Sequence, residues 1–302
     1  MAEPTLHAYL DIADSVVGLK SVKTILERGT RDCTETAAFS RAFPNATIHA
    51  FECNPATLPE CRKKVKKLKN VRLVEEAVSD KNGTIDFFPI DQEKTETTWK
   101  DGNPGASSLL QASGDYPAEK YVQKKISVKT TTLEDYFRSN KVQAVDLVWM
   151  DIQGAELMAL QGAGHRLKDI RTIHTEVEFM EIYKGQPLYR DIKRYLNQRG
   201  FSQYGFTAEG EYSGDAVFVN TRGLSYAKRI DLRWRDIKID ARYIHKFFKR
   251  GNLRVKTFFI VNTPKSRWQV KGNPVKSAYR FVVVFSKAVQ DKRRAKSSMT
   301  NS

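Results

Sequence analysis

Several features of membrane, secreted and disulfide-rich proteins are missing from this sequence. No apolar run approaches the ~20 residues that a helix needs to cross a bilayer, and the first residues lack the basic and apolar regions of a secretory signal. The three cysteines, Cys33, Cys53 and Cys61, are too few and too irregularly spaced for a disulfide framework or a closed zinc site. We therefore expect a cytoplasmic protein without a resident metal ion.

The composition is typical of a folded chain. Its 302 residues are 40% hydrophobic and 28% charged, with 17 Gly and 10 Pro, which excludes a wholly disordered or collagen-like protein. The length suits one large domain, or one domain with a smaller appendage.

The formal net charge of +16 is concentrated at the C-terminal end. Residues 221–302 contain 22 Lys and Arg against 4 Asp, a net charge of +18. The other 220 residues contain 51 − 22 = 29 basic and 35 − 4 = 31 acidic residues, a net charge of −2. This shift predicts an almost neutral domain over 1–220 and a basic accessory segment over 221–302.

The first of these parts alternates between β-rich runs and amphipathic helical stretches. Strands are predicted at 22–26, 47–51, 71–78, 145–152, 170–179, 201–206 and 215–220. Helices are predicted at 32–42, 55–68, 155–167 and 188–199. Such alternation indicates an α/β fold with a mostly parallel sheet, in which ligands bind beyond the carboxyl ends of the strands.

Two strand ends point to a nucleoside-containing cofactor. The first strand runs into Glu27 and Gly29, where a glycine allows a tight turn and a close approach to a ligand. The second ends at Glu52, whose carboxylate can accept both hydroxyls of a ribose. Because the G-x-G-x-x-G pyrophosphate loop is absent, S-adenosylmethionine fits better than a dinucleotide. The alternative is an ordinary turn glycine and a solvated glutamate.

The later strands add carboxylates at the same edge of the sheet. Asp151 ends the fourth strand and precedes a glycine turn into a helix. Period-two alternation places His174, Glu176 and Glu178 on one face of the next strand. Three polar side chains on one face predict either a cleft or an edge strand that faces water.

An ordered set of motifs resembles the FkbM-type S-adenosylmethionine-dependent O-methyltransferases over roughly residues 20–205. These are ILERGTRDCTET, FECNP, NVRLVEEAVSDKNGTIDFF, SSL, TTLEDYF, VDLVWMDIQGAELMALQGA and HTEVEFMEIYKGQPLYRDIKRYLNQRGF. The resemblance implies a class I methyltransferase fold, with a seven-stranded sheet whose last strand is antiparallel, and hydroxyls of sugars or natural products as substrates. It also implies that Glu27 and Gly29 border the methionine end of the cofactor, that Glu52 binds the ribose, and that Glu76 and Ala77 lie beside the adenine.

The sequence departs from the pattern of this family at three positions. Arg28 follows the first-strand acid where an apolar residue is usual, and Trp149 and Gln153 replace a lysine and a glutamate around Asp151. A mechanism that uses that lysine is therefore excluded. Trp149 is either an apolar wall for the substrate or a core residue.

Transfer of a methyl group to a hydroxyl requires a group that accepts the hydroxyl proton. Asp151 is the first choice, with Glu176 and His174 as alternates or orienting groups. Two carboxylates and one histidine argue only weakly for a divalent cation. No Asn/Asp-Pro-Pro-aromatic run and no Pro-Cys pair is present, which disfavours methylation of base amino groups and of cytosine carbon.

Two further segments bear on the partner. The polar insertion at 90–125, with Trp99, Tyr116 and Tyr121, is either a lid over the substrate or a disordered loop. Residues 221–302 interleave basic and aromatic side chains, and 236–250 form a helical stripe of Ile237, Ala241, Ile244 and Phe248. That composition suits an anionic membrane surface or RNA, or only a soluble appendage.

Three functions therefore remain open at this point. The motifs favour O-methylation of a sugar, a glycan or a small-molecule hydroxyl, by an enzyme that is cytoplasmic or peripheral to a membrane. The basic segment favours 2'-O-methylation of RNA ribose. The departures at Arg28, Trp149 and Gln153 favour a binding protein that has kept the cofactor fold without activity.

Overall fold

The computed structural model describes the backbone of residues 2–249 and the side chains of residues 4–243. Contacts divide the chain into two compact units, residues 1–236 and 237–302. The sequence changes in charge at residue 220, whereas the first unit extends to residue 236. Of the second unit, the structure describes residues 237–249, which continue the last helix. The predicted basic and aromatic residues beyond 249, including Trp268 and Tyr279, lie outside the described residues.

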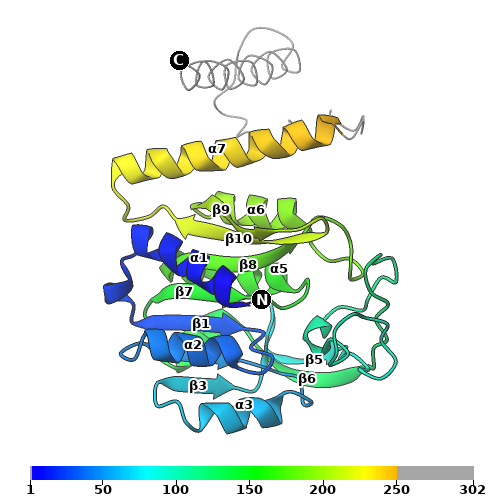
Figure 1. The fold of residues 1–302 in the computed structure, drawn as a ribbon. Coiled ribbons are helices and arrows are strands. Elements are labelled where there is room, and N and C mark those ends of the chain that lie inside the picture. The colour runs from blue at the N-terminus through cyan, green and yellow to red at the C-terminus, as the bar shows by residue number, and fades with distance from the viewer. Residues whose placement is uncertain (1, 250–302) are drawn as a thin grey trace, which may run out of the picture. The chain divides into compact units, whose positions relative to one another are not determined.

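A seven-stranded sheet forms the centre of the first unit, in the order β3-β2-β1-β7-β8-β10-β9 (Figure 1). Strand β10 pairs antiparallel with both β8 and β9, and the remaining pairs are parallel. This arrangement confirms the class I methyltransferase fold with an antiparallel last strand. Its strands are β1 (Thr24–Arg28), β2 (Thr47–Phe51), β3 (Val71–Val74), β7 (Val145–Met150), β8 (Ile170–Glu178), β9 (Phe201–Glu209) and β10 (Ser213–Asn220).

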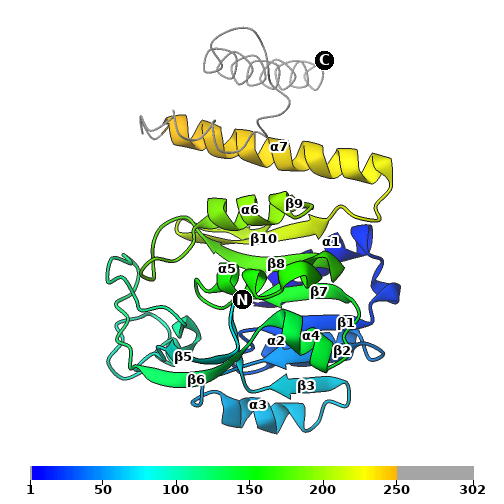
Figure 2. The same cartoon turned by 180° about the vertical axis from the view of Figure 1, so that it is seen from behind.

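Helices cover both faces of this sheet (Figures 1 and 2). On one face α1 (Ala2–Val16) and α2 (Thr34–Ala42) bury Tyr9, Phe39 and Phe43 against Ile25 and Trp149. On the other face lie α4 (Leu133–Ser139), α5 (Glu156–Gln161) and α6 (Tyr189–Gln198). The remaining helices are α3 (Leu58–Val65), α7 (Tyr226–Lys249) and the short 3-10 turns Leu19–Ser21, Pro104–Ala106 and Gly164–Asp169.

A small second sheet flanks the carboxyl edge of the main one. It has the order β4-β6-β5, from β4 (Ala77–Val78), β6 (Ile126–Thr131) and β5 (Gly83–Phe87). The insertion at 90–125 begins after β5 and is ordered by isolated bridges, among them Phe88 with Ser108 and Ile90 with Gln123. The insertion is therefore a folded cover and not a disordered loop.

The structure corrects several element boundaries. The predicted strand at 71–78 is two strands, β3 and β4, which belong to different sheets. The first strand lies at Thr24–Arg28 and not at 22–26, and β8 is an interior strand, which excludes the water-facing edge alternative. The helix predicted at 155–167 ends at Gln161, and a 3-10 helix at Gly164–Asp169 takes up the rest of that range. Between them Gly162 packs tightly, since a Cβ there would lie 2.0 Å from the carbonyl oxygen of Ser79. Helices α1 and α4 and strands β5 and β6 were not predicted.

None of the helices in the described part of the chain is both long and apolar enough to span a bilayer.

Candidate functional site

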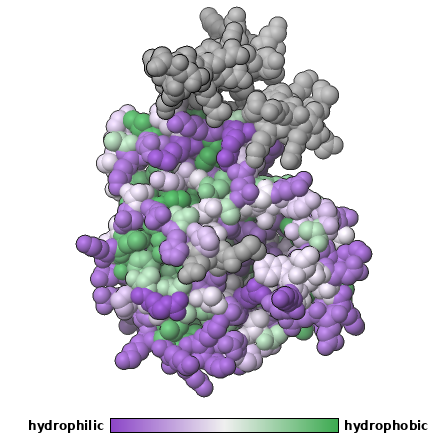
Figure 3. Space-filling model, in the orientation of Figure 1, coloured by the Kyte–Doolittle hydropathy of each residue, from purple (hydrophilic) through white to green (hydrophobic). Residues whose placement is uncertain are grey.

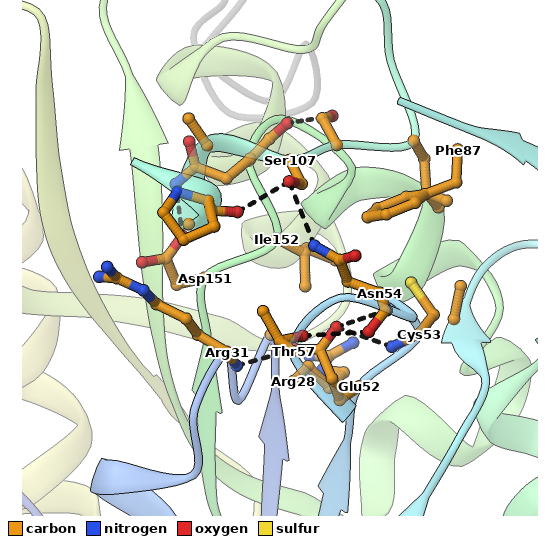
Figure 4. A pocket seen from close by; sticks show the side chains of 18 of the residues that line it. Arg28, Arg31, Glu52, Cys53, Asn54, Thr57, Phe87, Ser107, Asp151 and Ile152 are labelled. Atoms are coloured by element: carbon orange, nitrogen blue, oxygen red, sulfur yellow. Dashed lines mark hydrogen bonds between the residues drawn. The ribbon is translucent and has the colours of Figure 1, made fainter. Parts of the chain in front are cut away.

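A pocket lies at the carboxyl ends of β1, β2 and β7, where the order of the sheet reverses between β1 and β7. This is the edge at which the sequence predicts the ligand site. In Figure 4, Asp151 and Arg31 lie on one side of the pocket, and Cys53 and Phe87 lie on the other side. Glu52 and Asn54 lie between the two sides.

Gly29 is required where β1 leaves the sheet. Its φ is +78°, and a Cβ there would lie 1.8 Å from the carbonyl oxygen of Asp151. The backbone amides of Gly29 and Thr30 both donate to the carbonyl of Phe51, at 3.2 Å. The glycine thus allows the ends of β1, β2 and β7 to converge, and it also lines the pocket.

Glu52 is the buried acid at the end of β2. Its carboxylate accepts hydrogen bonds from the backbone amides of Arg31 (2.8 Å), Cys53 (2.8 Å) and Asn54 (2.7 Å). These donors stabilise the charged form, but burial dominates and raises the pKa of Glu52 to about 7. Glu52 therefore changes its charge near neutral pH while it faces the pocket.

Asp151 and Glu176 form a carboxylate pair that one amide group bridges. The Nε2 of Gln153 donates to Oδ1 of Asp151 and to Oε2 of Glu176, both at 2.7 Å. Asp151 is accessible from the pocket, yet the surrounding protein desolvates it and raises its pKa. Burial and the nearby Asp151 charge raise the pKa of Glu176 well above its usual range. Both groups therefore bind protons more tightly than free carboxyls do.

The insertion closes the pocket through contacts with these same loops. The hydroxyl of Ser108 donates to the carbonyl of Gln153 at 2.6 Å, and the amide of Asn54 donates to the hydroxyl of Ser107 at 3.4 Å. Arg31 forms an ion pair with Asp101 and lies 5.6 Å from the ring centre of Trp99.

Tyrosines from two segments stand near the carboxylate pair. The hydroxyl of Tyr183 lies 2.9 Å from Oε1 of Gln153. Tyr121 stacks on Tyr183 with ring centres 6.1 Å apart, and Tyr116 contacts Tyr121 at 5.8 Å. None of these three tyrosines lines the pocket, and Tyr183 is fully buried, whereas Trp99 does line it.

The opposite end of the pocket is more apolar. Ala77 and Phe87 are buried there, in one cluster with Cys53. Glu76 lines the same end. The apolar lining of this end suits a flat aromatic base, and Glu52 lies between this end and Asp151 (Figure 4).

Arg28 provides buried positive charge beside the pocket that it lines. It is 1% exposed, and none of its three guanidinium nitrogens has a hydrogen-bond partner among the described residues. Burial lowers the pKa of Arg28 to about 9, and the nearby Glu156 opposes this shift. A buried guanidinium without acceptors is costly, so these donors fit an anionic group that a bound ligand supplies.

Two of the predicted site residues lie outside the pocket. Glu27 is 1% exposed, its Oε2 has no hydrogen-bond partner among the described residues, and burial raises its pKa well above its usual range. His174 stacks on Trp149 with ring centres 3.9 Å apart, and its Nε2 lies 2.8 Å from the hydroxyl of Thr207. Trp149 is therefore a core residue and not a wall for the substrate. The predicted residues that the pocket does bring together are Gly29, Glu52, Glu76, Ala77, Asp151 and Glu176.

Several residues of the pocket were not assigned a role from the sequence. Asn54 and Ser107 belong to the motifs FECNP and SSL. The spacing of these motifs supports the family resemblance, but it does not indicate what either residue does. Gln153 was noted only as a departure, and Arg31 lies in the motif ILERGTRDCTET without an assigned role. Within the described residues, no group of three or more His, Cys, Asp or Glu side chains is arranged to hold a metal ion.

Comparison with known proteins gives one family. The model of the methyltransferase FkbM domain matches residues 27–203. The curated 2-O-methyltransferase NoeI of Sinorhizobium fredii (strain NBRC 101917 / NGR234) is 33% identical over 170 residues, which are 56% of this chain and 68% of NoeI.

Solved structures are similar at lower levels. Magnesium protoporphyrin IX methyltransferase (ChlM) from Synechocystis PCC 6803 with bound SAM has a TM-score of 0.39 and 11% identity, covering 72% of this chain and 80% of that one. Aeropyrum pernix fibrillarin, in complex with S-adenosyl-L-methionine, has a TM-score of 0.39 and 14% identity, covering 67% and 68%. The evidence for a family therefore comes from the domain match and the curated relative.

Proposed function

The chain belongs to the FkbM methyltransferase family and is an S-adenosylmethionine-dependent O-methyltransferase, and from this premise we propose that its acceptor is a hydroxyl group of a sugar or glycan. The observation that carries the proposal is the Asp151–Gln153–Glu176 arrangement, which presents proton-accepting carboxylates at the cofactor edge of the sheet, in a pocket that the ring of Trp99 also lines.

The residues present fit S-adenosylmethionine. The end with Ala77 and Phe87 suits the adenine, and the Glu52 carboxylate can accept the two ribose hydroxyls. The unpaired guanidinium of Arg28 suits the carboxylate of the methionine part. When bound, the cofactor supplies an electrophilic methyl group on a sulfonium sulfur.

Asp151 is the proposed base. Its carboxylate faces the pocket, and its raised pKa brings its proton affinity closer to that of the hydroxyl it must deprotonate. Gln153 orients the carboxylate by donating one hydrogen bond to it and a second one to Glu176. Burial and the charge of Asp151 raise the pKa of Glu176 well above its usual range, whereas the hydrogen bond from Gln153 opposes the rise at Asp151, so Glu176 is the member of the pair that binds a proton more readily and Asp151 is the proposed acceptor.

His174 does not take part in the proposed chemistry. Its ring is stacked in the core, and burial lowers its pKa to about 3, so that it stays neutral. Glu27 is likewise a buried residue behind the pocket, whose role toward the cofactor stays a prediction.

A sugar acceptor is favoured by the aromatic ring that lines the pocket together with the carboxylates. The ring of Trp99 is 42% exposed and can pack on the apolar face of a pyranose, and carboxylates can accept its hydroxyls. The curated relative is a 2-O-methyltransferase, which is consistent with transfer to oxygen.

The test is to incubate the full chain with a methyl-labelled donor and with pools of oligosaccharides, glycolipids and RNA. We expect the label in base-stable methyl ethers of the sugar pools, and we expect it to be lost with Asp151→Asn. Label that enters RNA ribose would instead establish the alternative 2'-O-methylation of RNA. Cofactor binding without label in any pool would favour the inactive binding protein.

A further inference from the structure

Helix α7 has two different faces within the first unit. Its inner face is fixed to the methyltransferase core by Leu232, which is 3% exposed. Asp236 forms a 2.6 Å ion pair with Lys193 of α6, and Arg235 lies 4.5 Å from the ring centre of Tyr204 of β9. The Nζ of Lys228 donates to the carbonyl of Ser15 of α1 at 3.1 Å. The start of α7 is therefore a docked helix with a defined orientation.

The outer face of the same helix is apolar. Tyr226, Ile230 and Trp234 are 74%, 40% and 50% exposed. At about 100° per residue, these positions fall within one narrow stripe of the helix. We call these three residues the outer stripe. Figure 3 shows apolar and hydrophilic residues side by side where α7 begins.

Basic residues border the outer stripe on one side. Arg229 and Arg233 are exposed there, and on the other side the exposed Asp231 forms an ion pair with Arg235. The stripe itself contains no charged residue. An apolar centre with a tryptophan and a tyrosine beside a row of cations is the pattern of a helix that lies in a membrane interface.

From this arrangement we infer that the outer stripe of α7 docks the enzyme on an anionic lipid bilayer. Isoleucine and tryptophan side chains would enter the acyl boundary, while Arg229 and Arg233 reach the lipid phosphates. RNA fits this surface less well, since isoleucine offers a nucleotide neither charge nor an aromatic face. A second copy of the chain fits less well because pairing of two stripes would bring their arginines together. The net charge of +18 over residues 221–302 adds attraction of the same sign.

Vesicle flotation of the full-length protein tests the inference. We expect binding to phosphatidylcholine vesicles that contain about 30% phosphatidylglycerol, little binding to phosphatidylcholine alone, and loss at high salt. Each basic residue near such a surface contributes about 1 kcal/mol, or roughly 5-fold, so Arg229→Gln with Arg233→Gln should weaken partitioning about 25-fold. The control removes two exposed lysines from another basic cluster, Lys63→Gln with Lys67→Gln, and should have a much smaller effect.

The apolar contribution needs its own pair of variants. Ile230→Ser with Trp234→Ser should reduce binding at least 10-fold, whereas Val122→Ser, which changes an apolar residue 38% exposed in the insertion, should not. Brominated lipid should quench the tryptophan fluorescence of the wild type and quench Trp234→Phe markedly less, although that variant still binds.

Three results would overturn the inference. The first is equal quenching of the wild type and Trp234→Phe. The second is equal vesicle binding by Val122→Ser and by the stripe variant, which is Ile230→Ser with Trp234→Ser. The third is self-association or RNA binding that depends on the stripe, in a protein that does not bind vesicles. Methyl transfer to a soluble acceptor should be unchanged in the stripe variant, which separates this surface from the proposed chemistry.

Discussion

The side-chain amide of Gln153 donates a 2.7 Å hydrogen bond to the carboxylate of Asp151, and its second hydrogen reaches Glu176 at the same distance. A glutamine is needed for this geometry, because a carboxylate has no hydrogens to donate and would add a third acid to the pair. The departure of this chain from the glutamate that its family resemblance implies therefore has a structural reason.

Gln153→Glu should shift the pH dependence of turnover. Loss of two donors and gain of a nearby negative charge both raise the pKa of Asp151, so a higher pH is needed to leave the base unprotonated. The acidic limb of kcat should move to higher pH, and Gln153→Ala, which only removes the donors, should move it less. Rate profiles between about pH 6 and pH 9 check this order. An unchanged limb in both variants would show that the pair does not titrate in the reaction.

Asp151→Asn should separate the three candidate bases. The amide keeps the shape but accepts no proton, so kcat should fall about 100-fold or more while cofactor affinity changes little. His174→Phe keeps the stacking on Trp149 and should retain activity within a few-fold. Single-turnover rates and calorimetric binding measure the two effects. Full activity of Asp151→Asn would leave Glu176 or no protein base.

Cofactor binding should depend on pH through Glu52. Its pKa is raised to about 7, so the carboxylate that accepts ribose hydroxyls is present mainly above this pH, and affinity should rise as the pH passes upward through 7. Glu52→Ala should weaken binding by about 1.5–3 kcal/mol, roughly 10- to 150-fold, and flatten the pH dependence. Calorimetry is the measurement, with Glu75→Gln as the control for an exposed acid. No binding by the wild type at any pH would contradict the cofactor assignment.

The sheet and the carboxyl-edge residues could be predicted from the sequence because their signals are local. The apolar strands and the acids that follow them, Glu52 and Asp151, are read from consecutive residues. The misplacement of His174 shows the limit. Alternation does place His174 on the same face of β8 as Glu176. The strand register, however, stacks His174 on Trp149 and beside Tyr9, well inside the core, and only Glu176 reaches the pocket.

The pairing of Gln153 with two carboxylates could not be predicted either. It depends on a backbone φ of +54° at Gln153 and on the approach of β8 to β7, which are properties of the tertiary fold. The same holds for the insertion, whose contacts with Asn54 and Gln153 join segments far apart in the chain. Long polar insertions carry no periodic signal, so sequence alone left a lid and a disordered loop equally open.

Arg28→Met should move stability and cofactor affinity in opposite directions. Methionine fills a similar space without charge, so the variant removes a buried guanidinium that has no hydrogen-bond partner among the described residues. Without cofactor, we expect the melting temperature to rise by about 2–12 °C, as expected for 1–3 kcal/mol in a domain of this size. With S-adenosylmethionine, we expect affinity to fall about 10-fold or more, because the carboxylate of the methionine part loses its cationic partner. Differential scanning calorimetry with and without cofactor measures both effects.

Arg28→Lys is the control that keeps the charge. Its melting temperature and its cofactor affinity should lie between those of the wild type and those of Arg28→Met. A lower melting temperature with unchanged affinity would mean that Glu156, and not the cofactor, is the partner of Arg28.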